Sequence, residues 1–169
     1  MDDFDYRRFC RDAWQIAKDH GWHETKRPAW ELCALVHSEI SEALEAFRRD
    51  EPVMWTTGTG KPEGLAVELA DALIRCADWA HDEGSPGPLG VAERYPGQSV
   101  PVRLGILHWR ISAVMADRAT AWTHKPARML AEVEAAIHDL GLSDVMTDAV
   151  AAKMAYNHTR PYRHGGKRA

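Results

Sequence analysis

The stretch ELCALVHSEISEALEAFRRD, residues 31–50, decides the fold of this chain. Its apolar residues recur at intervals of three and four, the spacing of a helix with one apolar side. Glu39 falls inside that apolar side, and Glu42 lies at its edge. The two glutamates are three positions apart, so their carboxylates project from one side of the helix about one turn apart. The apolar side consists of Leu32, Leu35, Val36, Ile40, Ala43, Leu44 and Phe47.

A second helical run, KPEGLAVELADALIRCADWAHDE at residues 61–83, carries a similar pair of acids. Glu68 and Asp71 are again three positions apart, on a narrow polar strip of an otherwise apolar helix. Packing the two apolar sides together would bring the four carboxylates close to one another. Their charged form would then be disfavoured by burial and by mutual repulsion. A bound cation resolves this conflict, and oxygen ligands without Cys or His favour Mg²⁺ or Mn²⁺ over Zn²⁺. We therefore predict metal ligands at Glu39, Glu42, Glu68 and Asp71.

A purely structural interpretation of these acids stays open. Glu-x-x-Glu is common on exposed helices, and Glu68 and Asp71 could simply belong to the solvated strip of their helix. Three features together favour metal binding: Glu39 inside an apolar side, acid pairs in two successive helices, and a basic motif near the end of the chain.

Length and composition set limits on the class of protein. A chain of 169 residues is expected to form one domain, residues 1–169. A formal net charge of −4 argues against a general nucleic-acid-binding protein, which needs a basic face. No apolar run is long enough for a membrane span, and the acidic start MDDFDYRRFC lacks the apolar segment of a signal peptide. The three cysteines form no C-x-x-C pair, which indicates free thiols in a reducing compartment and a cytoplasmic protein.

The rest of the chain also has helical patterns, and no alternating strand pattern of useful length occurs. Residues 84–100 hold three prolines and four glycines and are expected to form a loop. The predicted fold is all-α, a bundle of about six helices. Besides the two acid-bearing runs, the predicted helices cover residues 4–20, 101–122, 126–140 and 143–160.

The helices at 101–140 resemble a degenerate copy of the acid-bearing pair at 28–83. LVHSEISEAL (35–44) aligns with ILHWRISAVM (106–115), and KPEGLAVELADAL (61–73) aligns with KPARMLAEVEAAI (125–137). Glu68 is matched by Glu132, but Arg110, Ala113 and Ala135 replace the other three acids. We hypothesise an internal duplication whose second half kept its packing surface and lost its metal site; the alternative is convergence of two helix pairs.

A basic motif lies in the segment 143–168. Lys153, Asn157 and Arg160 are spaced to share one face of the final helix, and apolar residues lie on that same face. Lys167 follows a Gly pair whose backbone N–H groups can approach an anion closely. Cations that face a metal-binding acid cluster suit a polyphosphate that bridges both. A solubilising basic tail is the competing interpretation.

The chain resembles the MazG-like all-α nucleoside triphosphate pyrophosphohydrolases. The resemblance rests on Glu39-x-x-Glu42 followed after 25 residues by Glu68-x-x-Asp71, and on the sequence motif KMAYNHTRPYRHGGK at 153–167. It covers residues 28–83 and 143–168, whereas residues 84–140 depart from the compact family core.

The resemblance implies Mg²⁺-dependent attack of water on the α-phosphate of a nucleoside triphosphate, with Mn²⁺ as a possible substitute. Glu39 and Glu42 are carried over as catalytic residues as well as metal ligands, one of them orienting or deprotonating the water. It also implies a homodimer or a higher homo-oligomer. The residues that we expect to bind the substrate are Lys153, Asn157, Arg160 and Lys167 for the phosphates and Trp30 for the base, with Trp22 and Trp55 also within plausible reach.

Two alternatives to a general nucleotide pyrophosphohydrolase remain. A phosphoribosyl-ATP pyrophosphatase would share the fold and differ in substrate. A helical module that binds a nucleotide or a partner without turnover would share the site and differ in function.

Overall fold

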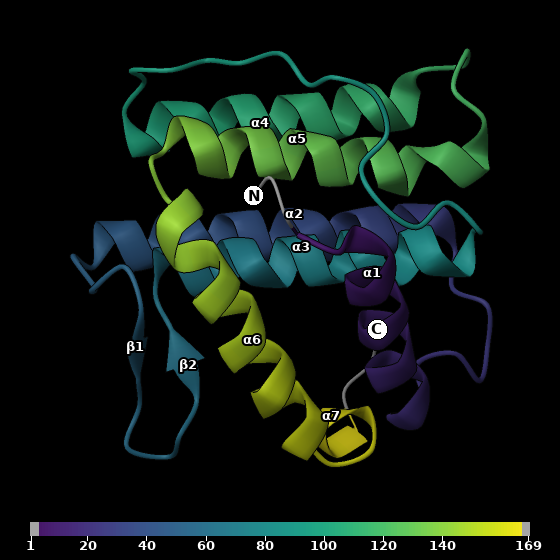
Figure 1. Ribbon diagram of the computed structural model, residues 1–169, viewed down its shortest axis with the longest axis horizontal. Coiled ribbons are helices and arrows are strands. Elements are labelled where there is room, and N and C mark those ends of the chain that lie inside the picture. Colours follow the sequence, from purple (N-terminus) through teal and green to yellow (C-terminus); the bar gives the residue numbers. More distant parts are fainter. Residues whose placement is uncertain (1–3, 167–169) are drawn as a thin grey trace.

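The computed structural model describes residues 4–166, and the protein is mostly helical (Figure 1). This confirms the predicted all-α bundle. A short antiparallel hairpin, Trp55 opposite Glu63 and Thr56 opposite Pro62, is an addition that the sequence pattern did not predict. The main helices are α1 (Tyr6–Asp19), α2 (Ala29–Arg48), α3 (Leu65–Asp82), α4 (Val100–Ala116), α5 (Lys125–Asp139) and α6 (Ser143–Thr159); the hairpin is β1 (Trp55–Thr56) and β2 (Pro62–Glu63), and two short turns are η1 (Trp122–His124) and α7 (Arg163–Gly166).

Two antiparallel helix pairs are stacked on each other. In Figure 1 the pair α4 and α5 lies above the pair α2 and α3, while α1 and α6 descend from the other side of α3. Helix α3 is therefore central, and 13 of its 18 residues are buried. One cluster of buried apolar side chains connects α1 through α6 and includes the three cysteines, which are free and buried as expected.

Local features fix where the acid-bearing helices begin and end. Pro28, in an extended conformation, precedes α2, which contains neither Gly nor Pro. Gly64 precedes α3 with φ +112°, and a Cβ at that position would lie 2.5 Å from the carbonyl oxygen of Pro52. Only glycine fits this close approach. The hairpin is thereby held against the first turn of α3.

Helix α4 ends at Ala116, six positions before the expected end at residue 122. Asp117 is extended, and the buried amine of Lys125 donates to the carbonyl oxygens of Val114, Met115 and Asp117 at 2.8, 3.0 and 2.6 Å. This amine satisfies carbonyls that another helical turn would otherwise use. A cation at the C-terminal end of a helix is also favoured by the helix dipole.

Helices α2 and α4 begin at positions that the predicted repeat aligns, whereas α5 begins four aligned positions earlier than α3. Helices α2 and α4 begin 71 positions apart, the offset that aligns His37 with His108. These two imidazoles stack with ring centroids 5.1 Å apart, and their Nδ1 atoms are 2.8 Å apart. Aligned residues thus meet where α2 packs against α4. The common origin of the two helix pairs stays a prediction.

Within residues 4–166, no helix combines the length and the apolar character that crossing a lipid bilayer requires.

Candidate functional site

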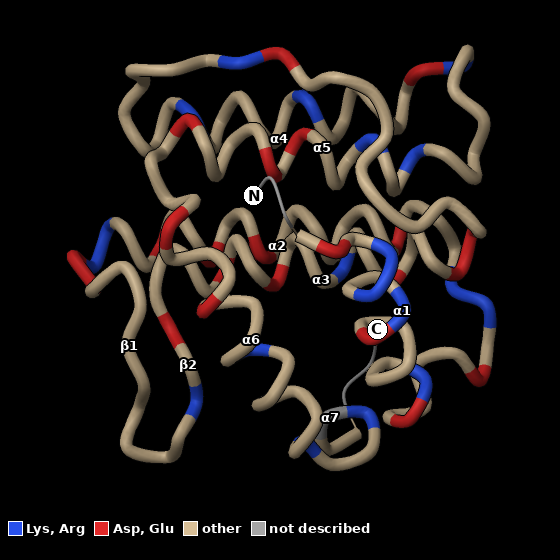
Figure 2. The backbone as a smooth tube through the Cα atoms, in the orientation of Figure 1, with Lys and Arg blue, Asp and Glu red and all other residues tan. Residues whose placement is uncertain are grey.

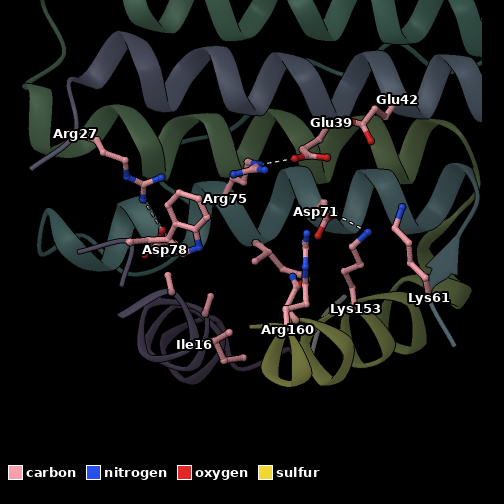
Figure 3. Close-up of a pocket in the computed structure, with 15 residues that line it drawn as sticks. Ile16, Arg27, Glu39, Glu42, Lys61, Asp71, Arg75, Asp78, Lys153 and Arg160 are labelled. Carbon is pink, nitrogen blue, oxygen red and sulfur yellow. Dashed lines mark hydrogen bonds and ion pairs between the residues drawn. The ribbon is translucent and has the colours of Figure 1, made fainter. Parts of the chain in front are cut away.

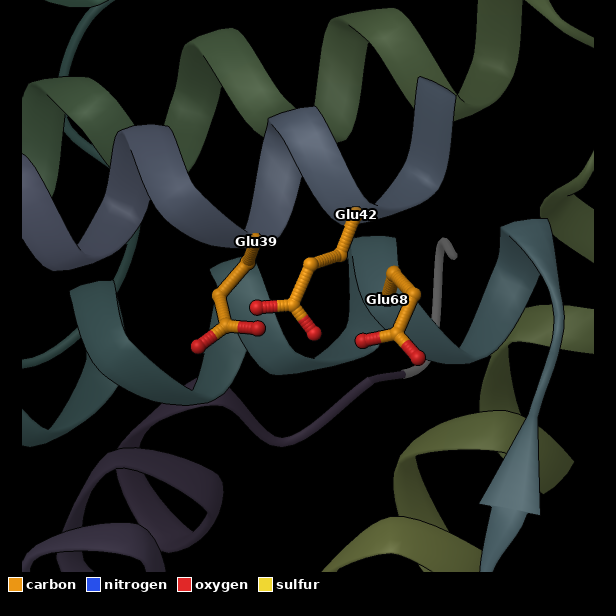
Figure 4. A group of neighbouring side chains, drawn as sticks. All are labelled: Glu39, Glu42 and Glu68. Atoms are coloured by element: carbon orange, nitrogen blue, oxygen red, sulfur yellow. The ribbon is translucent and has the colours of Figure 1, made fainter. Parts of the chain in front are cut away.

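Three carboxylates from two helices meet at one place. Glu39 and Glu42 project from adjacent turns of α2, and Glu68 projects from the first turn of α3 (Figure 4). One oxygen from each carboxylate lies within 4.8 Å of the others. Glu39 and Glu68 are each only 4% exposed, whereas Glu42 is exposed. The structure therefore brings together three of the four predicted metal ligands.

Burial makes the charged form of this cluster unfavourable. It raises the pKa of Glu39 despite the opposing effect of the Arg75 guanidinium, which donates to that carboxylate. Burial likewise raises the pKa of Glu68 to about 8, and Asp71 and a hydrogen bond with Glu63 add to the effect, while Lys153 opposes it. A cation bound to the three carboxylates would relieve both the desolvation and the repulsion.

Asp71, the fourth predicted ligand, lies beside the cluster and pairs with a lysine. The Nζ atom of Lys153 is 2.7 Å from Asp71 and 4.0 Å from Glu68 (Figure 3). Burial alone would lower the pKa of Lys153, but the two carboxylates outweigh it and raise that pKa above its ordinary value. Lys153 is 3% exposed, as its predicted inward position requires. Figure 2 shows the corresponding basic segment in the middle of α6, below acidic segments of α2 and α3.

Glu39, Glu42, Asp71 and Lys153 border a cavity of about 210 Å³ that lies among α1, α2, α3 and α6. Asn157 and Arg160 line it with Lys153, so the predicted polar face of α6 does point inward. The segment after α6 is fastened to the end of α1, because the Tyr162 hydroxyl donates to Glu24 and the Arg163 N–H donates to the carbonyl of His20. The cavity is lined by Ala13, Ile16, Ala17, Trp22, Arg27, Glu39, Glu42, Lys61, Asp71, Ile74, Arg75, Asp78, Lys153, Asn157 and Arg160.

Trp30 does not line this cavity, contrary to our expectation. It lies in the first turn of α2 and is 61% exposed. It is nine positions away from Glu39, which is about 13 Å along a helix. Trp22, in the connector between α1 and α2, is the tryptophan that lines the cavity. Trp55 lies on the hairpin, half-exposed, and donates to Glu51. Lys167 lies outside the described residues.

Sequence reasoning also missed three cations that line the site, Arg27, Arg75 and Lys61. Arg75 follows Asp71 by one helical turn on the polar strip of α3, so its position was readable as part of the same face. Lys61 lies just before β2 and pairs with Glu63 at 2.6 Å. The helical run expected at residues 61–83 included Lys61, but α3 begins only at Leu65. Helical spacing therefore did not indicate that Lys61 lines the cavity.

The donor set fits a hard divalent cation. Within residues 4–166, the three-carboxylate group contains only oxygen ligands, with no thiol or imidazole among them. Mg²⁺ and Mn²⁺ prefer such ligands and keep open positions for water and phosphate oxygens. Two of the carboxylates are buried close together, and one is exposed toward solvent. Such a site could hold a cation and still admit a ligand.

The corresponding place in the second helix pair is already neutralised. Arg110 aligns with Glu39, and its guanidinium donates to both oxygens of Glu132 at 3.0 and 2.7 Å. Glu132 is 3% exposed and aligns with Glu68. An internal cation thus compensates the one acid that the second pair retains.

No protein-family model, curated protein or solved structure matches the chain.

Proposed function

We propose that this protein is a divalent-metal-dependent nucleotide pyrophosphohydrolase, which converts a nucleoside triphosphate to the monophosphate and pyrophosphate. The observation that carries the proposal is the meeting of Glu39, Glu42 and Glu68 beside the buried cation Lys153, at the edge of a cavity. Acids alone would suit many metal sites. Acids and cations that border the same cavity suit a ligand that carries phosphate and brings a metal ion with it.

The three carboxylates would hold Mg²⁺, which, when bound, lowers the pKa of a water molecule and offsets phosphate charge. Glu42 is exposed and can accept a proton from an attacking water molecule. The oxygen of that water would bond to the α-phosphorus, and the bond from the α-phosphorus to the bridging oxygen would break. The departing pyrophosphate carries the electron pair of that bond.

The cations of the site would stabilise the negative charge that moves onto pyrophosphate. Lys153 and Lys61 lie at the acid-bearing side of the cavity, and Arg160 lies near its middle (Figure 3). Positive charges placed in advance near a developing negative charge lower the barrier, because they need no rearrangement during the reaction. The buried free thiols Cys10, Cys33 and Cys76 accord with a reducing compartment, and we place the reaction in the cytoplasm.

Release of pyrophosphate from a panel of ribo- and deoxynucleoside triphosphates, with Mg²⁺, with Mn²⁺ and with EDTA, tests the proposal. We expect metal-dependent release that EDTA abolishes, and the panel identifies the preferred base and sugar. Phosphoribosyl-ATP belongs in the panel, since a marked preference for it would identify the narrower enzyme. A folded, metal-bound protein without turnover on any member would favour the non-catalytic binding module instead.

Glu42→Gln is the matched test of the site, with Glu45→Gln as its control. Glu42 belongs to the acid cluster, whereas Glu45 lies one turn away on α2, where it pairs with Arg48 at 2.6 Å. We expect Glu42→Gln to reduce kcat by about 100-fold or more, the scale of losing one group that stabilises a transition state. Glu45→Gln should leave kcat unchanged. Equal loss in both variants would place the chemistry elsewhere.

A further inference from the structure

The middle of the cavity differs in character from its two charged ends. Figure 3 shows Lys61 and Glu42 at one end and Arg27 and Asp78 at the other. The wall between them is apolar where α1 faces α3. It consists of Ala13, Ile16 and Ala17 from α1 and Ile74 from α3. A cavity for phosphate alone would not need this apolar wall, because phosphate binds to charges and N–H groups.

Helix α3 gives the scale of the distance between the two ends. Asp71, beside the acid cluster, and Asp78, at the far end, are seven positions apart on α3, or about 10 Å. That length is comparable to the reach of a nucleoside from its α-phosphate. A nucleotide whose α-phosphate lies at the acid cluster would therefore place its sugar and base along Ile74, toward Asp78.

A polar group without a partner marks the same region. The Oδ1 atom of Asn157 is buried and accepts no hydrogen bond, and Asn157 lines the cavity. A buried acceptor that has lost water is unfavourable until a donor reaches it. Asn157 lies one turn after Lys153 on α6, so its amide lies farther along the cavity than the lysine amine. A hydrogen-bond donor of a base or a sugar would satisfy it.

The far end of the cavity is built from ordered groups. Asp78 is 2.6 Å from Nε2 of His23, and the guanidinium of Arg27 lies over the ring of Trp22 at 5.7 Å. Trp22, Arg27 and Asp78 also line a neighbouring cavity of about 550 Å³. The end beyond Ile74 thus offers an aromatic surface together with polar groups, which is the usual composition of a nucleobase site.

We propose that the apolar wall formed by Ala13, Ile16, Ala17 and Ile74 is the nucleoside subsite, and that Asn157 hydrogen-bonds to the bound nucleoside. This inference rests on the proposed function for the position of the phosphates. It adds the direction in which the substrate lies: phosphates toward Lys61, nucleoside toward Trp22. Specificity for base and sugar is then set by α1 and α6 rather than by the acid-bearing helix α2.

The test separates nucleoside binding from phosphate binding. Calorimetry in the presence of Mg²⁺ would measure the affinity for a non-hydrolysable α,β-methylene nucleoside triphosphate and for inorganic tripolyphosphate. Ala17→Phe fills the apolar wall, and Gln15→Phe introduces the same side chain at an exposed position of the same helix. We expect Ala17→Phe to lower the affinity for the nucleotide analogue by about tenfold or more and to leave the affinity for tripolyphosphate unchanged. Gln15→Phe should bind both as the wild type does.

Asn157→Leu, which removes the amide at similar size, keeps the inference testable if Ala17→Phe does not fold. This variant should also lower the affinity for the nucleotide analogue and leave the affinity for tripolyphosphate unchanged. Unchanged nucleotide affinity in both variants, or equal loss of nucleotide and tripolyphosphate, would overturn the inference. A wild type that binds tripolyphosphate and no nucleotide would also overturn it. Failure of the proposed function is seen separately, as nucleotide binding without pyrophosphate release.

Discussion

Lys153 is the residue on which the electrostatics of the site depend. Its amine is buried between Asp71 and Glu68, so it both compensates these acids and faces the cavity. Lys153 and Asp71 were both predicted as site residues from helical spacing alone, Lys153 as a phosphate ligand and Asp71 as a metal ligand. Their contact was not predictable, because 82 positions separate them and no local pattern specifies how α6 crosses α3.

Replacing Lys153 by Met should destabilise the metal-free protein. The substitution leaves the buried Glu68 and the partly buried Asp71 without their cation. Breaking a buried ion pair in this way costs about 3 kcal/mol. Urea unfolding measures the change. Lys18→Met, at an exposed position of α1, should have little effect. Equal stability of Lys153→Met and the wild type would show that Lys153 does not compensate these acids.

Asp139 gives the protein a dependence of stability on pH outside the candidate site. Burial would raise the pKa of Asp139, but the N–H of Tyr95 and the guanidinium groups of Arg94 and Arg103 outweigh this and lower it. A carboxyl group with a lowered pKa stabilises the folded state above its unfolded pKa, near 4. This stabilisation is lost as the pH falls through the lower, folded pKa.

Asp139→Asn should therefore lower the free energy of unfolding at pH 7 by about 3 kcal/mol, because the guanidinium of Arg103 is only 1% exposed and would lose its counter-charge. The difference from the wild type should shrink as the pH is lowered below about 4. Thermal unfolding followed from pH 7 to pH 3 checks both statements. A difference that is constant across this range would exclude the carboxylate charge as its cause.

At the scale of elements, periodicity predicted the six long helices, and tertiary contacts set the details that it missed. The end of α4 was placed six residues too late, because the amine that satisfies its last carbonyls comes from Lys125, in the next helix. The β1–β2 hairpin has two residues in each strand, too few for an alternating pattern to be recognised. Trp22 lies in the connector before α2, and Trp30 lies in the first turn of α2. No helical periodicity extends over both positions, so the sequence pattern does not indicate which tryptophan faces α3.

Lys125→Met tests how α4 ends. The lysine amine is 2% exposed and makes three hydrogen bonds, and a hydrogen bond to a charged group contributes about 1.5–3 kcal/mol. We expect a loss of about 3 kcal/mol in unfolding free energy, with faster amide hydrogen exchange confined to the last turn of α4 and residues 117–124. Unchanged exchange in that segment would contradict this role for Lys125.

At the scale of the whole molecule, one helix pair carries the acid cluster, and the other carries a site in which Arg110 compensates Glu132. If the two helix pairs derive from one ancestor, the second pair retains the backbone positions of a metal site. The double variant Arg110→Glu/Ala113→Glu restores two of the missing acids at the aligned positions. Without metal it should be less stable than the wild type by about 3 kcal/mol, because Glu132 loses its partner.

Mn²⁺ should return part of that stability, since a ligand that binds only the folded state stabilises it. Arg110→Gln/Ala113→Gln is the control: it loses the same ion pair but offers no new carboxylates, so Mn²⁺ should raise its stability only as it raises that of the wild type. Equal responses of the two double variants to Mn²⁺ would argue against a former metal site. The expectation of a homodimer stays a prediction, to be measured by sedimentation.

The most direct test of the central claim is hydrolysis of a preferred nucleoside triphosphate in ¹⁸O-labelled water with Mg²⁺, with the products analysed by mass spectrometry. Attack on the α-phosphorus, bound between the acid cluster and Lys153, predicts one labelled oxygen in the nucleoside monophosphate and none in the pyrophosphate. Label in pyrophosphate, or formation of a diphosphate and orthophosphate, would contradict the account.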